Sequence, residues 1–93
     1  MYNEHGVSEM AQPVNESVDT LVIYRRGAPH PLLHAFRWRD RRYNINETFF
    51  VHRERSGETI SLCYSVGSGG DRFELRLDTG LGRWTLEAID ASR

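Results

Sequence analysis

Strict alternation of apolar and polar residues is the feature that most constrains the fold of this chain. It is clearest in residues 58–66 and 72–78, where nearly every second residue is aliphatic or aromatic. Side chains of a β-strand point alternately to the two faces of a sheet, so this pattern predicts strands with one buried face. No stretch of the sequence repeats with the helical period of about 3.6 residues. The chain is therefore expected to be all-β.

Turn-forming residues divide this pattern into short segments. Arg25-Arg26-Gly27, Ser56-Gly57, residues 67–70 and residues 79–82 interrupt it, at intervals typical of a small barrel or sandwich. Strands that follow one another in sequence usually pair. We therefore expect a small antiparallel meander of about five to six strands, in a strongly bent sheet or an SH3-like barrel. The expected strands are residues 18–24, 34–39, 42–53, 58–66, 72–78 and 84–89.

Length and composition indicate one domain. Residues 1–13 show no period and are expected to be a flexible tail, residues 14–90 a single all-β domain, and residues 91–93 a frayed end. The single cysteine, Cys63, cannot form an internal disulfide. No apolar run reaches the length of a membrane span, and the first residues do not resemble a signal peptide. These features predict a cytoplasmic protein without a membrane partner.

Residues 36–45 are expected to form the central hairpin. A turn at Asp40-Arg41 places Trp38 opposite Tyr43, and the same pairing is expected for a longer loop. One face then carries the apolar set Phe36, Trp38, Tyr43 and Ile45, which we expect to join the core with Leu62, Phe73 and Trp84. The other face carries Arg37, Arg39, Arg42 and Asn44, with Arg41 at the tip.

Two segments beside the hairpin are irregular. Pro29 and Pro31 predict that residues 28–34 form an extended connector rather than a helix. In the second hairpin strand, Glu47 interrupts the apolar face, which a bulge at residues 46–48 would correct. Such a bulge would leave Phe50 on the outer face.

Charge is concentrated around the hairpin, although the net charge of the chain is only −1. Residues 25–55 contain eight arginines and three acidic residues, whereas both flanking segments are acidic. Every basic residue is an arginine, and arginine pairs with carboxylates and phosphates in a fork geometry. The candidate binding residues are those of the hairpin and of the turn before it: Arg37, Arg39, Arg41, Arg42, Arg25 and Arg26.

This basic surface allows two binding functions and one alternative in which it binds nothing. It can contact a protein partner, since arginine and aromatic residues are enriched at interface centres. It can also neutralise the phosphates of DNA or RNA without sequence specificity. In the alternative without binding, the surface is a solvated face whose positive charge is balanced by Glu74, Asp78 and similar acidic residues across the sheet. We expect a non-catalytic binding or adaptor module for a protein partner, monomeric or weakly dimeric, with nucleic-acid binding as the alternative.

No residue pattern in the sequence predicts a catalytic or metal-binding site. His30 and His34 have a spacing that suits a metal on one helix face, but Pro31 excludes a helix there. Cys63 lies within an expected strand, where a small core or second-face residue is the simpler interpretation. No enzyme activity, cofactor or metal is therefore expected.

The hairpin sequence resembles a known bacterial family. Phe36-x-Trp38-Arg39-x-Arg41-Arg42-Tyr43-x-Ile45, followed by Phe73-Glu74-Leu75 and Gly82-x-Trp84, is similar to a family of small β-rich proteins of unknown function. The resemblance covers about residues 32–90, and Asp40 stands where that family carries glycine. It implies an association with accessory subunits of error-prone DNA polymerases in the bacterial damage response. It implies no functional residue.

Overall fold

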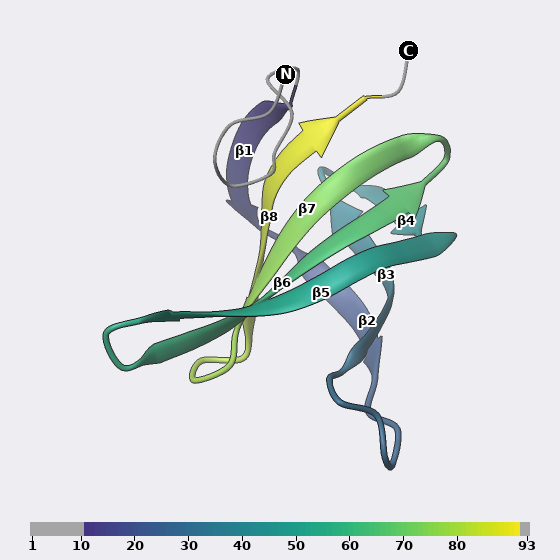
Figure 1. The fold of residues 1–93 in the computed structure, drawn as a ribbon. Coiled ribbons are helices and arrows are strands. Elements are labelled where there is room, and N and C mark those ends of the chain that lie inside the picture. The colour runs from purple at the N-terminus through teal and green to yellow at the C-terminus, as the bar shows by residue number, and fades with distance from the viewer. Residues whose placement is uncertain (1–10, 92–93) are drawn as a thin grey trace.

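Two antiparallel β-sheets make up the computed structural model of this chain, which describes residues 11–91 (Figure 1). The larger sheet has the strand order β1-β8-β7-β6-β5, and the smaller has the order β2-β3-β4. The strands are β1 (Gln12–Ser17), β2 (Asp19–Ile23), β3 (Leu32–Trp38), β4 (Arg41–Asn44), β5 (Glu47–Ser56), β6 (Thr59–Ser68), β7 (Asp71–Asp78) and β8 (Arg83–Asp90). The prediction of an all-β antiparallel fold is confirmed.

The structure has eight strands where about six were expected, because residues 12–17 form the additional strand β1 and the expected strand of residues 42–53 is divided into β4 and β5. A bend lies at each of these two places. At Val18, between β1 and β2, the N–H donates to the carbonyl of Trp84 at 3.1 Å. Between β4 and β5, the N–H of Ile45 donates to the carbonyl of His34 at 2.9 Å, and the N–H of Asn46 donates to the carbonyl of Gly67 at 2.8 Å. Each bend lets one continuous segment pair with the large sheet at one end and with β3 at the other.

The two sheets do not close into a barrel. Among the described strands, β1 and β5 are the edges of the large sheet, and β2 and β4 are the edges of the small one. Successive strands pair within each sheet, as in the expected meander, and β1 adds to β8. The barrel expectation is therefore corrected to two sheets joined by bent strands.

The core lies between the sheets and includes the apolar face of the hairpin. The ring of Phe36 packs against Phe73 with centroids 5.2 Å apart, and Tyr64 packs against Trp84 at 4.9 Å. Burial of each such side chain contributes about 1.5–3 kcal/mol. Partly buried residues surround this cluster, among them Trp38, Tyr43, Ile45 and Leu62. The predicted composition of the hairpin's core face is confirmed.

The register of the hairpin differs from the predicted one. Phe36 pairs with Tyr43 and Trp38 with Arg41, so the turn is Arg39-Asp40. These two residues have φ angles of 52° and 62°, the left-handed conformation of a type I′ turn. The predicted turn was one residue too late in the sequence. An error of this size changes which residues pair but leaves every side chain on the same face, so the alternating pattern does not reveal it. Alternation therefore predicts the faces and not the turn.

Several strand boundaries also require correction. β1 begins at Gln12, inside the expected tail, while residues 1–10 lie outside the described residues. β3 begins at Leu32, inside the expected connector. The bulge in β5 lies between Thr48 and Phe50, slightly later than expected.

Gly67 belongs to β6 rather than to the expected loop at residues 67–70. A Cβ at this position would lie 3.2 Å from the ring of Phe49, which covers the glycine from β5. The glycine thus permits a close approach between an aromatic ring and the strand backbone. The turn itself is reduced to Gly69 and Gly70, which both have positive φ.

Neither sheet is accompanied by a helix in residues 11–91. Accordingly, the described part of the chain has no helix able to cross a membrane.

Candidate functional site

The four hairpin arginines are divided among three places. Arg37 and Arg42 are cross-strand neighbours on the outer face of the small sheet. Arg39 lies in the turn, where its guanidinium contacts Glu16 at 2.7 Å and covers the ring of Trp38 at 4.5 Å. Arg41 is the first residue of β4 and lies on the same face as the aromatic residues, with its guanidinium carbon 5.3 Å from the ring centre of Tyr43. The predicted arginine face is therefore corrected to the pair Arg37 and Arg42.

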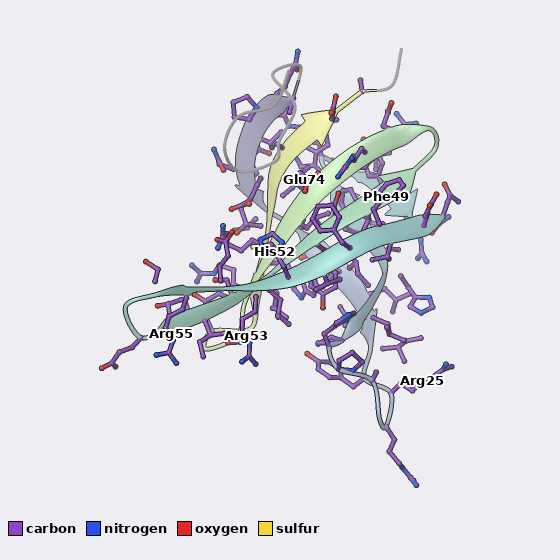
Figure 2. All side chains as sticks on the ribbon, in the orientation of Figure 1. Arg25, Phe49, His52, Arg53, Arg55 and Glu74 are labelled. Carbon is purple, nitrogen blue, oxygen red and sulfur yellow. The ribbon has the colours of Figure 1, made fainter. Side chains whose placement is uncertain are left out.

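Arg25 and Arg26 do not join this pair. They follow β2 in the β2–β3 loop, whereas Arg37 pairs with Asp19 at the opposite end of β2. Figure 2 shows Arg25 in that loop, at the lower end of the molecule in this view. The six predicted residues thus form several basic positions rather than one stripe.

The surroundings of Arg37 and Arg42 combine charge with exposed apolar surface. Arg42 donates from Nε to Asn44 Oδ1 at 2.8 Å, and neither arginine takes part in an ion pair within residues 11–91. Beside them lies a shallow hollow of about 160 Å³, whose lining includes Asp19 and Leu21. Leu21 is 50% exposed. We call this surface the Arg37–Arg42 face.

Glu74 and Asp78, the two acidic residues named in the alternative of a balanced solvated face, lie away from Arg37 and Arg42, and the acidic residue opposite Arg37 is Asp19 on β2. Glu74 contacts Arg72 at 3.2 Å on the large sheet. Asp78 accepts hydrogen bonds from the N–H groups of Gly80 and Leu81 at 2.9 and 3.0 Å, and so closes the β7–β8 turn. Both carboxylates have partners of their own.

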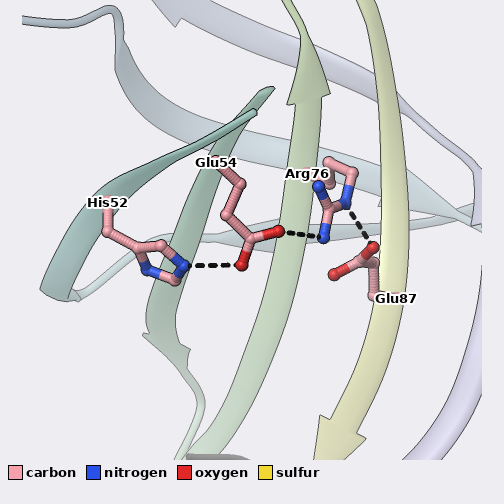
Figure 3. A network of polar contacts seen from close by, with 4 residues as sticks. All are labelled: His52, Glu54, Arg76 and Glu87. Atoms are coloured by element: carbon pink, nitrogen blue, oxygen red, sulfur yellow. Dashed lines mark hydrogen bonds and ion pairs between the residues drawn. The ribbon is translucent and has the colours of Figure 1, made fainter. Parts of the chain in front are cut away.

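A polar network crosses the outer face of the large sheet (Figure 3). The Nε2 atom of His52 lies 3.0 Å from Glu54 Oε2, and Arg76 donates to Glu54 Oε1 at 2.9 Å. The same guanidinium donates from Nε to Glu87 Oε2 at 2.6 Å. Hydrogen bonds from His52 and Arg76 lower the pKa of Glu54, and those to Glu87 and Glu54 raise the pKa of Arg76.

Cys63 lies under this network. It pairs with His52 across β5 and β6 and is 8% exposed. Burial raises the pKa of its thiol to about 11. The prediction of a small residue on the second face of its strand is confirmed. One potential ligand atom from each of His52, Glu54 and Cys63 lies within 4.8 Å of the others.

Sequence reasoning missed this three-residue cluster. The residues that it weighed for a metal lie elsewhere: His30 stacks edge-on against Tyr64, and His34 is an exposed residue of β3. The sequence signal that could have predicted this cluster is the turn at Gly57, which sets the pairing of β5 with β6. A two-residue loop there pairs Ser56 with Thr59 and brings His52 opposite Cys63.

A second polar cluster surrounds Arg72 on the same face. Its Nε donates to Ser65 Oγ at 2.8 Å and to Glu74 Oε2 at 3.2 Å, and the hydroxyl of Ser65 donates to the same carboxylate at 3.0 Å. Burial raises the pKa of Glu74. The guanidinium also lies 5.1 Å from the ring of Phe49 and 5.5 Å from that of Phe50. This cluster is internally satisfied.

The two sides of β5 differ in character. Phe50 and His52 oppose Ser65 and Cys63 on the outer face, whereas Arg53 and Arg55 oppose Leu62 and Ile60. Figure 2 shows Phe49, His52 and Glu74 on one side and Arg53 and Arg55 on the other. Phe50 is 47% exposed, so its expected place on the outer face is confirmed.

Comparison of the chain with family models, with curated proteins and with solved structures finds no match. The resemblance to the small β-rich family stays a prediction, as do the partners that it implies. Functional proposals therefore rest on the geometry above.

Proposed function

We propose that this protein is a non-catalytic binding module whose Arg37–Arg42 face recognises an acidic segment of a partner protein. The observation that carries this proposal is that Arg37 and Arg42 lie opposite each other and form no ion pair within residues 11–91, although Asp19 lies opposite Arg37 on β2. Like charges directly opposite each other destabilise a sheet. A partner carboxylate placed between Arg37 and Arg42 would relieve this repulsion.

The neighbouring hollow suggests the rest of the ligand. Leu21 presents half of its surface to solvent at the edge strand β2, next to the two arginines. Arginine forms bidentate hydrogen bonds with carboxylates, and interface centres combine such arginines with apolar contacts. The geometry therefore suits a segment in which acidic residues alternate with aliphatic ones.

A protein ligand fits this distribution of arginines better than a nucleic acid does. Binding to a phosphate backbone draws its affinity from several cations along one track. Here Glu16 neutralises Arg39, and Arg25 and Arg26 lie beyond the other end of β2. Two adjacent arginines beside Leu21 favour a compact contact with one acidic segment.

The test is a binding titration with two labelled probes of defined chemistry. The first is a peptide that alternates glutamate and leucine, and the second is a single-stranded oligonucleotide of similar charge. Fluorescence anisotropy is followed at several salt concentrations with the natural chain, with Arg37→Ala/Arg42→Ala, and with Arg53→Ala/Arg55→Ala. The last variant removes the same charge from β5, where Arg53 and Arg55 are also outside the ion pairs of the described residues.

We expect the peptide to bind the natural chain and the Arg53/Arg55 variant alike. The Arg37/Arg42 variant should lose at least about tenfold in affinity, because each charged hydrogen bond contributes about 1.5–3 kcal/mol. Equal loss in both variants would indicate a general charge effect and contradict the proposal. Tighter binding of the oligonucleotide, with log affinity falling linearly with log salt, would replace it with nucleic-acid binding.

A further inference from the structure

His52, Glu54 and Cys63 form a compact set of three different metal-ligating side chains. His52 and Glu54 share the outer face of β5, two residues apart, and Cys63 lies directly opposite His52 on β6. One ligand atom from each residue lies within 4.8 Å of the other two. Ligands about 2.0–2.3 Å from one ion lie closer together than this, so small side-chain rotations would complete the set.

The donor types select a class of metal ion. A thiolate, an imidazole and a carboxylate suit Zn²⁺ and related borderline divalent ions, whereas Mg²⁺ and Ca²⁺ require oxygen ligands. Three protein ligands leave one position of a tetrahedral ion for water. The side chains of His52 and Glu54 are 48% and 44% exposed, so an ion and its water can reach them from solvent.

Arg76 and Glu87 give this set a supporting layer. Glu54 uses Oε2 toward His52 and Oε1 toward Arg76, so a metal could take the Oε2 side while the bond to Arg76 at 2.9 Å persists. Arg76 is itself oriented by Glu87 at 2.6 Å (Figure 3). Hydrogen-bonded carboxylates of this kind hold metal ligands in position.

The charges around the set also match a divalent ion. With Cys63 as the thiolate that binds metals, this residue, Glu54 and Glu87 carry three negative charges, and Arg76 carries one positive charge. The remaining two negative charges would be neutralised by a divalent cation. His52 contributes a neutral nitrogen ligand.

We propose that His52, Glu54 and Cys63 bind one Zn²⁺-like divalent ion on the outer face of the large sheet, with Arg76 as a residue that positions Glu54. This site is distinct from the Arg37–Arg42 face and does not depend on the function proposed for it.

Cobalt titration of the full chain, purified metal-free in reducing buffer, tests this proposal. We expect one equivalent of Co²⁺ to produce a thiolate-to-cobalt charge-transfer band in the near ultraviolet, together with the visible bands of a tetrahedral ion. Added Zn²⁺ should abolish these bands, whereas excess Mg²⁺ should not. Absence of a charge-transfer band would overturn the proposal.

Variants then assign the ligands. Cys63→Ser should remove the charge-transfer band, and His52→Gln, at an exposed strand position, should weaken Co²⁺ binding by more than about tenfold. A control with His5, His30 and His34 all changed to glutamine leaves His52 as the only histidine of the four and should keep the bands. Retention of the bands in Cys63→Ser, or their loss in the triple control with circular dichroism unchanged, would contradict the assignment.

Discussion

The arginines of the two sheets have different surroundings, although the sequence presents them in similar alternating strands. On the large sheet, Arg72 and Arg76 contact carboxylates, and the side chain of each is 33% exposed. On the small sheet, Arg37 and Arg42 face each other and form none of the ion pairs found in residues 11–91. Alternation places an arginine on a face, but its neighbours decide whether it stabilises the fold or remains available to a partner.

This difference has an energetic basis. Removing one partner of a half-buried ion pair leaves the other charge without compensation in a region of reduced solvent access. Removing an exposed arginine that has no ionic partner leaves no such charge behind. Arg72 and Arg76 should therefore affect stability, and Arg37 and Arg42 should affect binding.

Among the substitutions, the largest effect is expected for Arg72→Ala. The substitution leaves Glu74, whose side chain is 19% exposed, without its ion pair and removes the cation–π contacts to Phe49 and Phe50. We expect the free energy of unfolding to fall by about 1–3 kcal/mol in urea denaturation. Glu74→Gln in the same background should recover part of the loss. A change no larger than that of Arg37→Ala would break the distinction between the sheets.

Alkaline pH should also lower the free energy of unfolding. Burial raises the pKa of Cys63 from 9.0 to about 11 and that of Tyr64 from 10.0 to about 12, so the unfolded chain loses these protons first. The contribution is fully present below pH about 9 and is lost as the pH rises through the folded-state values. Urea denaturation with a chelator present should show this decline, and Cys63→Ser should reduce its slope. A free energy of unfolding that is flat across this range would contradict burial of the thiol and the phenol.

The turn of the hairpin should respond in the opposite direction. Asp40 has a φ of 62°, where glycine is free of the strain that a side chain introduces. We expect Asp40→Gly to raise the free energy of unfolding by up to about 1 kcal/mol. Asp40→Ala is the control and should lower it. Destabilisation by glycine would indicate that the turn is not at Arg39-Asp40.

The smallest effect on stability is expected for the small-sheet arginines. Arg37→Ala and Arg42→Ala should each change the free energy of unfolding by no more than about 0.5 kcal/mol, because these arginines lie outside the ion pairs of the described residues. Relief of repulsion across β3 and β4 could make the change favourable. Thermal denaturation at low salt measures it. A loss comparable to that of Arg72→Ala would show that the Arg37–Arg42 face has a structural role.

The sequence predicts the faces of the strands far better than their ends. Alternation places Phe36, Trp38 and Tyr43 on the correct face, because a displaced turn does not change the two-residue period. At the turn, Arg39 donates a hydrogen bond to Glu16, which lies 23 residues away in the sequence. Such a contact leaves no local signal.

The alternating sequence pattern could not predict the bends or the polar network, because both depend on contacts between distant strands. Val18 and Ile45 are β-branched residues that suit any strand, and their N–H groups donate at the bends to the carbonyls of Trp84 and His34 in other strands. His52 and Cys63 meet only when β5 and β6 pair in one register. The sequence could have suggested that register through Gly57, but not the position of Arg76 beside Glu54.

Chemical-shift mapping by NMR tests the difference between the two sheets most directly. The labelled chain is titrated with the peptide that alternates glutamate and leucine, and the backbone amides and arginine side chains are followed. We predict the largest shifts at Arg37, Arg42 and Leu21, with the signals of Arg72 and Arg76 unchanged. Shifts centred on Arg72 and Arg76, with Arg37 and Arg42 unaffected, would contradict the account.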